Sequence, residues 1–203
     1  MRKILKINSL VLILVLMFNM LFPILSIAAE EKVTISFKDK NLYNAILTEL
    51  GSKVESCDAG TLTITIKKAN LETVTTLELE KKQITDVLGI EKFTSLTRLN
   101  LNYNEKISDI KPIAQLPNLE ALYLYNNKIT DITPLESLTK LKSLGLGENE
   151  ISNMEPLRTL TNITWLNLNA NKISDITLLS SLTNLEKLYL NTNEISDISP
   201  LAG

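Results

Sequence analysis

Acidic side chains and a single thiol are the groups in this sequence whose chemistry could support a reaction. Glu78 and Glu80 alternate with leucines, so both carboxylates would project from one side of a strand, as a glycoside-hydrolysing pair requires. The 203 residues include no histidine, which leaves Cys57 without the usual base for nucleophilic catalysis. The six glycines are scattered and form no phosphate-binding loop. We therefore interpret the two glutamates as a solvated acidic patch and predict a protein that is not an enzyme and needs no cofactor.

Aspartates at a fixed spacing suggest a second kind of chemistry, calcium binding. Only one acid occurs in each interval, Asn153 replaces it once, and no Asp-x-Asp or glycine-rich calcium loop accompanies it. Short polar side chains that accept hydrogen bonds from nearby backbone N–H groups explain the pattern better. We predict turns rather than a metal site at these positions, which are Asp86, Asp109, Asp131, Asp175 and Asp197.

The first 29 residues differ in composition from the rest. Three basic residues are followed by an apolar run over residues 10–27 and then by small residues. This order is typical of a secretory signal peptide, cleaved after Ala28 or Ala29. A membrane anchor is the alternative, because the run is near the lower length limit for spanning a bilayer. Asn19, Pro23 and the absence of a basic stop-transfer cluster favour cleavage.

The sequence that remains after residue 29 has 18 basic and 23 acidic residues, so nothing in its charge favours nucleic acid as a partner. We expect a secreted or cell-surface protein with no stable membrane span after cleavage. Its single cysteine, Cys57, excludes a disulfide within the chain. A lone cysteine of this kind is typically a buried, small apolar residue, and we expect that here.

One pattern of 22 residues recurs six times from Val74 onward. The second unit has 23 residues because NYNEKI contains one extra, and the last stops at Gly203 after 19. Apolar residues occupy positions 1, 4, 6, 11, 14, 17 and 20, which predicts a short strand followed by extended or 3-10 turns. The inward residues of one coil can be buried only by its neighbours, so the units must stack as a solenoid. The units begin at Val74, Leu96, Leu119, Leu141, Ile163 and Leu185.

Asparagine follows the strand at position 9 in five of the six units. An amide there offers two donors and an acceptor to backbone groups in the turn, and stacked copies would form a ladder of buried amides. Lys82 takes this place in the first unit, which predicts a more exposed turn. The ladder residues are Asn104, Asn127, Asn149, Asn171 and Asn193.

The pattern LxxLxLxxNxIxDIxPLxxLTx resembles the 22-residue leucine-rich repeat of bacterial internalins, and the match covers Val74 to Gly203. The resemblance implies an α/β solenoid: a leucine-rich-repeat horseshoe with concave parallel strands and a convex side of 3-10 or extended segments. It also implies a Gram-positive bacterial origin and, for some members, virulence and host-cell receptors as partners. Internalins usually continue into an immunoglobulin-like cap and wall-attachment elements. We therefore expect a truncated product or the first part of a longer gene.

Residues 30–73 are expected to form an N-terminal helical cap, because an open first coil would expose its leucines to water. The segment from Ile35 to Gly51 resembles the helical cap of internalin-like domains. Independently of that likeness, Asp39 or Asn41 can begin a helix that ends at Gly51. Residues 60–68 alternate as a strand, which we predict to pair with the first coil.

Positions 3, 5 and 7 of each unit point away from the core and form the expected binding face. Tyr123 and Tyr125 lie on one strand, Gly145 and Gly147 on the next, and Trp165 beyond them. This order predicts a bare notch between aromatic walls that could receive a partner side chain or a sugar ring. Strand propensity alone is the alternative explanation for the aromatic residues. The predicted contact residues are Tyr123, Tyr125, Gly145, Gly147, Trp165, Tyr189, Arg98 and Lys187.

The sequence thus predicts an exported, non-catalytic protein that binds a protein or glycan through its concave face, with a host-cell adhesin as one form of that role. Two alternatives stay open. One is a structural or interaction role in the cell envelope of the producing bacterium. The other is the recognition part of a longer enzyme.

Overall fold

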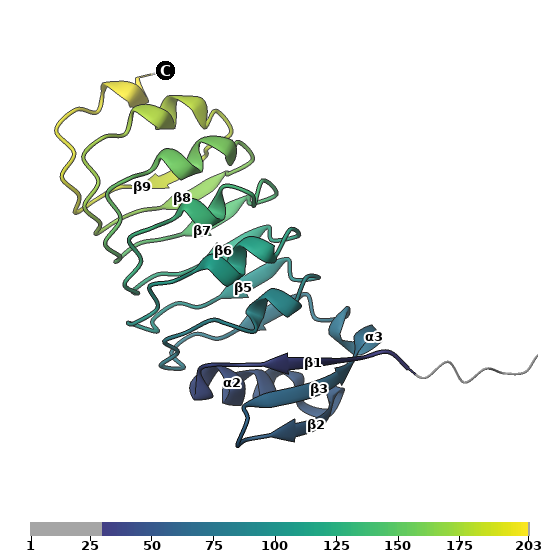
Figure 1. Cartoon of the computed structure of the whole chain (residues 1–203). Helices are drawn as coiled ribbons and strands as arrows, with labels where there is room; N and C mark the ends of the chain where they lie inside the picture. The colour runs from purple at the N-terminus through teal and green to yellow at the C-terminus, as the bar shows by residue number, and fades with distance from the viewer. Residues whose placement is uncertain (1–29, 203) are drawn as a thin grey trace, which may run out of the picture. The chain divides into compact units, whose positions relative to one another are not determined.

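A stack of short parallel strands forms one side of the molecule from residue 76 onward (Figure 1). The computed structural model describes residues 30–202, so the predicted signal peptide lies outside the described residues. The sheet follows chain order from β4 to β9, and equivalent positions of successive repeats pair in register, as Leu99 does with Leu122. Its strands are β4 (Thr76–Glu78), β5 (Arg98–Asn100), β6 (Ala121–Tyr123), β7 (Ser143–Gly145), β8 (Trp165–Asn167) and β9 (Lys187–Tyr189).

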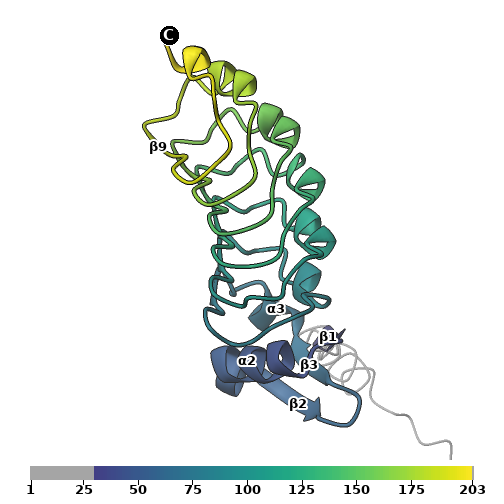
Figure 2. The same cartoon turned by 90° about the vertical axis from the view of Figure 1, so that its left-hand side faces the viewer.

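Short 3-10 helices form a column on the opposite side of the coils (Figure 2). The repeated aspartates position them: the Asp131 carboxylate accepts a hydrogen bond from the N–H of Thr133, the first residue of its 3-10 helix, at 2.9 Å. Pro134 follows at a position where a missing N–H costs nothing. The expected turns are confirmed here. The column contains η2 (Ile90–Lys92), η3 (Lys111–Gln115), η4 (Thr133–Leu135), η5 (Glu155–Thr159), η6 (Thr177–Ser181) and η7 (Ser199–Leu201).

The leucine and isoleucine positions of the repeat fill the space between the strands and the 3-10 helices. Leu122, Leu124 and Ile129 of the third unit are fully buried. Each such side chain contributes about 1.5–3 kcal/mol relative to an exposed one. In the last coil Leu188 is only partly buried, and 71% of Ile198 is exposed. Stacking on both sides is therefore what buries each coil.

A small α/β cap precedes the first coil. Its antiparallel sheet has the order β1-β3-β2, so β3 pairs with β1 and β2, and the predicted pairing of this strand with the first coil is wrong. The reason is local: the Asp58 carboxylate accepts the Gly60 N–H at 2.7 Å and reverses the chain from β2 into β3. The cap comprises β1 (Lys32–Ser36), α2 (Lys40–Leu50), η1 (Gly51–Lys53), β2 (Val54–Asp58), β3 (Thr63–Lys67) and α3 (Lys68–Leu71).

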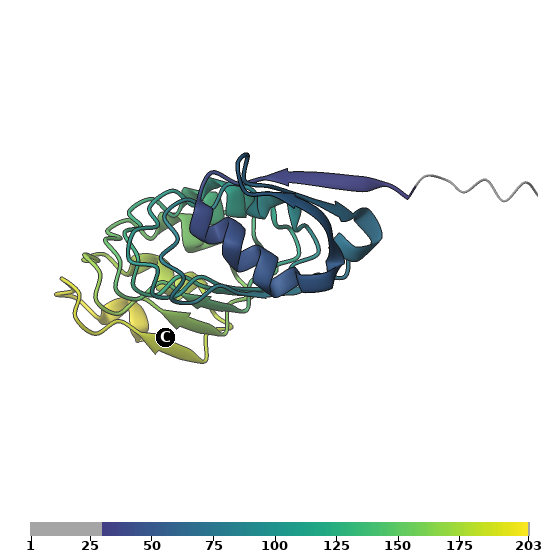
Figure 3. The ribbon, with the colours of Figure 1, turned by 90° about the horizontal axis from the view of Figure 1, so that it is seen from below.

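Asp39 joins this cap to the first coil. One carboxylate oxygen accepts the N–H of Leu42 at 2.8 Å and caps α2, and the other accepts both the N–H and the hydroxyl of Thr85 in the first repeat. Burial opposes ionisation of this carboxyl, but the hydrogen bonds from Thr85 and Leu42 outweigh burial and lower its pKa. Helix α2 thereby lies across the end of the stack (Figure 3) and covers the core of the first coil.

Cys57 is exposed on β2, so the expectation that it is a buried apolar residue is wrong. Strand β2 lies at the edge of the cap sheet, and the apolar alternation that fills the core belongs to its neighbour β3, through Ile64 and Ile66.

A ladder of asparagine amides closes the turn after five of the six strands, β5 to β9. Asn149 is representative: its Nδ2 donates to the carbonyls of Leu124 at 2.9 Å and Leu146 at 3.0 Å, and its Oδ1 accepts the N–H of Ile129 at 3.0 Å. One amide thus ties its own strand to the preceding coil. Asn104, Asn171 and Asn193 make the same set of bonds in their coils.

Asn127 is the exception in this ladder. Its Nδ2 donates to the carbonyls of Leu101 and Leu124. Its Oδ1 has no hydrogen-bond partner, and it is the only buried side-chain nitrogen or oxygen atom of residues 30–202 without one. The expected donor is the N–H of Ile107, which follows the extra residue of the 23-residue unit. We attribute the missing bond to that extra residue, because Glu105 adopts φ 64° and lengthens the turn.

This difference yields a stability test. Asn149→Ala leaves buried carbonyls and the Ile129 N–H unpaired and is expected to lower the free energy of unfolding by about 3 kcal/mol. Asn127→Ala removes only donated bonds, so its cost is expected to be lower by about 1 kcal/mol. Urea unfolding followed by circular dichroism measures both values. Equal costs would show that the Oδ1 bond adds nothing to the ladder.

Candidate functional site

Aromatic rings from three strands meet on the outer surface of the parallel sheet. The Trp165 ring lies 6.0 Å from that of Tyr123 and 5.8 Å from that of Tyr189, measured between centroids. The guanidinium of Arg98 lies over the Tyr123 ring at 4.6 Å. Tyr123, Trp165 and Tyr189, here called the aromatic row, therefore extend from β6 to β9, with Arg98 at one end.

Gly145 on β7 permits this contact between strands that are not neighbours, and Gly147 lies two residues beyond it. A Cβ on Gly145 would lie 3.1 Å from the Tyr123 ring and 3.5 Å from the Trp165 ring, and a Cβ on Gly147 would lie 2.4 Å from Asn169 Oδ1. Both glycines are buried beneath these side chains. The open notch predicted from the sequence is therefore wrong, because the flanking side chains lean over the glycines and fill it.

The first strands of the face are held by charge-assisted hydrogen bonds. Glu78 accepts from Arg98 Nε at 2.7 Å and from Asn100 Nδ2 at 2.8 Å, and Asn100 also donates to Glu80 at 3.3 Å. Burial opposes ionisation of Glu78, but these bonds and the Arg98 charge lower its pKa. Asn100 lies at position 5 of its unit, which predicted an outward side chain. Its side chain is only 6% exposed and is hydrogen-bonded to Glu78 and Glu80. The acidic patch is thus an ion-paired cluster that fixes Arg98 for contact with Tyr123.

A second aromatic contact lies where the strands end. The Tyr103 and Tyr125 rings are 5.1 Å apart, and the Lys81 ammonium lies 4.8 Å from the Tyr103 ring. The Tyr125 hydroxyl donates to the Glu148 carboxylate, which also accepts from Asn126 Nδ2 at 2.6 Å. These bonds lower the pKa of Glu148, and the carboxylate raises the pKa of Tyr125 to about 12.

Tyr103 was missed in the sequence because it occupies position 8, between the outward position 7 and the buried asparagine. All six position-8 residues adopt a left-handed conformation, with φ from 50° to 59°. This conformation carries the side chain along the edge of the face. The position-8 residues share no residue type, so nothing in the sequence indicated the left-handed conformation. The residues are Lys81, Tyr103, Asn126, Glu148, Ala170 and Thr192.

The other predicted contact residues occupy different parts of the same surface. Tyr189 on β9 is 45% exposed, and Lys187 on the same strand is exposed beside it. Arg98, Tyr123 and Trp165 are half-buried in contact with one another. Tyr125 is half-buried beside Tyr103 and Glu148. The structure thus brings Arg98, Tyr123, Trp165 and Tyr189 into one row. Tyr125 belongs to the separate contact with Tyr103, and the two glycines lie beneath neighbouring side chains.

A stack of coils with leucine cores, parallel strands on one side and 3-10 helices on the other is a leucine-rich-repeat solenoid. The family described as Leucine Rich repeats (2 copies) matches residues 117–159 and 161–203. An internalin (InlF) from Listeria monocytogenes is 35% identical with a TM-score of 0.72, over 82% of this chain and 47% of that one. Internalin C2 from the same organism is 31% identical with a TM-score of 0.50, over 82% and 90%. The chain belongs to the internalin family of leucine-rich-repeat proteins.

The chain spans about half the length of InlF. A more distant structure is the leucine-rich-repeat ectodomain of the plant receptor kinase GASSHO1/SCHENGEN3 from Arabidopsis thaliana, in complex with CASPARIAN STRIP INTEGRITY FACTOR 2. It is 27% identical with a TM-score of 0.50, over 58% of this chain and 15% of that one. No protein with a curated description matches the sequence. The internalin-type fold is a protein-interaction module, and its relatives are typically non-catalytic and often secreted or at the cell surface. Residues 30–202 contain no helix that is long and apolar enough to cross a membrane.

The Tyr125–Glu148 contact predicts a specific titration. Because the folded pKa of Tyr125 is raised, its hydrogen bond stabilises the fold below pH 10, and this contribution is lost as the pH rises through about 12. Glu148→Gln removes the negative acceptor, so the pKa of Tyr125 is expected to fall toward 10. Tyrosine 13Cζ shifts measured by NMR give this value, with Tyr125→Phe assigning the signal. An unchanged Tyr125 titration in the Glu148→Gln variant would contradict the contact.

Proposed function

We propose that this protein is an exported binding protein that recognises a protein partner through the outer surface of its parallel strands, the concave side expected for a leucine-rich-repeat solenoid. Export is supported by the signal-peptide pattern of residues 1–29. The aromatic row with Arg98 at its end is the observation that carries the proposal. Tyr, Trp and Arg are the residue types that dominate the energetics of protein interfaces.

The packing of the row favours rigid contact with a protein. Each ring is held by its neighbours, and the Tyr123 hydroxyl lies 3.0 Å from the Ser143 hydroxyl, so little side-chain entropy remains to be lost on binding. In addition, the rings are inclined by 65° and 55° to one another. The three rings therefore form no common flat platform of the kind on which a glycan stacks. A surface that presents ring edges and ring faces in turn suits the side chains of a protein.

A host-cell surface protein is the proposed partner, supported by the likeness to Listeria internalins. The envelope of the producing bacterium is the alternative location of the partner. A host-cell partner would retain the protein on animal cells, and an envelope partner would retain it on bacterial walls. The proposed role therefore needs a binding experiment that offers both surfaces to the same protein.

The test compares the exported protein with a Tyr123→Ala, Trp165→Ala, Tyr189→Ala variant in binding to animal epithelial cells and to isolated bacterial walls. The matched control is Glu136→Ala, Arg158→Ala, Ser180→Ala, in the 3-10 column and its connections. We expect saturable cell binding that weakens by about tenfold or more in the aromatic variant, since a buried interface aromatic contributes about 2 kcal/mol or more. Urea unfolding confirms that both variants are folded. Binding to walls alone, unaffected by the aromatic changes, would move the function to the bacterial envelope.

A further inference from the structure

The two halves of the strand surface differ in how far their polar groups are already bonded. In the half nearer the cap, the Glu78 carboxylate accepts from Arg98 and Asn100. The hydroxyl of Tyr123 lies 3.0 Å from a serine hydroxyl of β7, and that of Tyr125 donates to a glutamate. These groups are satisfied within the protein and leave little hydrogen-bonding capacity for a partner.

The other half, on β8 and β9, presents polar groups without partners. Within residues 30–202 nothing pairs with the Lys187 ammonium, the Trp165 Nε1–H or the Tyr189 hydroxyl. The side-chain amide of Asn191, exposed just beyond β9, is also unbonded within this part of the chain. A partner that covers these groups must therefore supply acceptors for them, because a donor that is buried without an acceptor is destabilising.

The two strongest donors lie on neighbouring strands. Lys187 pairs in register with Trp165, so both side chains project from the same face of adjacent strands. The Trp165 atoms nearest to a Cβ placed on Gly145 are Cζ3 and Cη2, at 3.5 and 3.8 Å. These atoms belong to the six-membered ring, so the five-membered ring with its N–H lies farther from Gly145. One acceptor group can therefore meet both donors.

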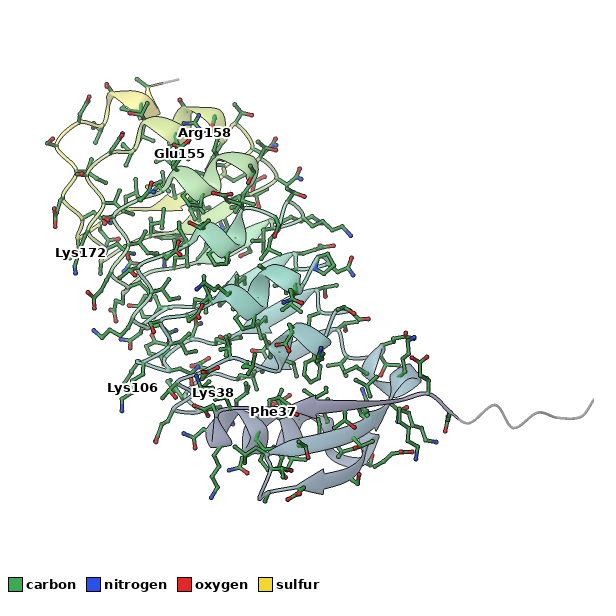
Figure 4. All side chains as sticks on the ribbon, in the orientation of Figure 1. Phe37, Lys38, Lys106, Glu155, Arg158 and Lys172 are labelled. Atoms are coloured by element: carbon green, nitrogen blue, oxygen red, sulfur yellow. The ribbon has the colours of Figure 1, made fainter. Side chains whose placement is uncertain are left out.

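The outward positions of β7 to β9 carry one charge, and it is positive. That charge is the Lys187 ammonium, and the preceding acid, Glu186, is exposed and forms no ion pair with it. The Glu148 carboxylate, at the edge of the same half, already accepts two hydrogen bonds. In contrast, Arg158 on the 3-10 column is held by Glu155 at 2.9 Å (Figure 4). Lys187 is thus a cation of the strand surface that has kept its charge for a partner.

We propose that this half of the strand surface binds an acidic side chain of the protein partner, an aspartate or glutamate presented beside an apolar residue. The carboxylate accepts from the Lys187 ammonium and the Trp165 N–H. The apolar neighbour packs on the Trp165 and Tyr189 rings, whose centroids are 5.8 Å apart. The inference rests on the proposed function and deepens it, because it names the chemistry by which the partner is selected.

The first test uses acetyl-aspartyl-leucine amide as the probe and acetyl-asparaginyl-leucine amide as its neutral control. Trp165 is the only tryptophan of the chain, so its indole N–H gives a single NMR signal that needs no assignment. We expect a saturable shift of this signal, with the aspartyl probe bound about two- to fivefold more tightly, the range for an exposed ion pair. Added salt is expected to reduce this preference.

Three variants of the exported protein separate the charge from the fold. Lys187→Gln is expected to abolish the preference for the aspartyl probe, and Lys187→Arg is expected to retain it. Lys92→Gln removes an exposed lysine of η2, in the 3-10 column, and is expected to leave the preference unchanged. Thermal unfolding compares the Tm of each variant with that of the wild type.

Equal responses to the two probes, which include no response to either, would overturn the proposal. An unchanged preference in folded Lys187→Gln would overturn it as well. Tighter binding of N-acetylneuraminic acid than of the aspartyl probe would assign the site to an acidic glycan and contradict a protein side chain as the ligand.

The cell-binding assay separates this inference from the proposed function. We expect Lys187→Gln to weaken cell binding by about two- to fivefold and the aromatic variant to weaken it further. If the aromatic changes weaken cell binding and Lys187→Gln does not, the acidic contact is overturned and the strand-face function stands. If the aromatic changes have no effect while the aspartyl probe still shifts the Trp165 signal, the proposed function fails.

Discussion

The buried amide at position 9 is the interaction on which the rest of the structure depends. Its Oδ1 accepts from the preceding coil, and its Nδ2 donates to a carbonyl of that coil and to one of its own. The amide therefore ties successive coils together, as Asn149 does for the third and fourth units. The residue before it is held in the left-handed region, which costs about 1–2 kcal/mol in a residue with a side chain. The amide bonds offset that cost in every unit that carries the asparagine.

The surface of the strands is built on these tied coils. Because Gly145 on β7 has no side chain, the rings of Tyr123 and Trp165 meet above it. The ion pair between Glu78 and Arg98 extends the same row toward the cap. The surface is therefore held in place before any partner arrives. A rigid aromatic surface of this kind is suited to recognition of a partner.

The periodicity of the sequence predicted the solenoid, its buried leucines and the amide ladder, because each of these depends on residue type and spacing. It could not predict that the space above the glycines is filled. Spacing gives the strand from which a side chain projects, but the rotamer decides whether that side chain lies over a neighbouring glycine. The partners of β3 depend on the turn at Asp58, and the exposure of Cys57 depends on which cap strand lies at the edge. Tyr103 was missed because alternation along a strand does not describe a left-handed residue beyond its end.

Contact between the partner and the strand surface can be measured most directly by photo-crosslinking. Asn191 is exposed beyond β9 on the strand side, and Ser180 is exposed on η6 in the 3-10 column. Each is replaced in turn by p-benzoylphenylalanine, and the protein is irradiated on epithelial cells. The account predicts a crosslinked cell-surface protein from position 191 and none from position 180. Crosslinking from position 180 alone would contradict it.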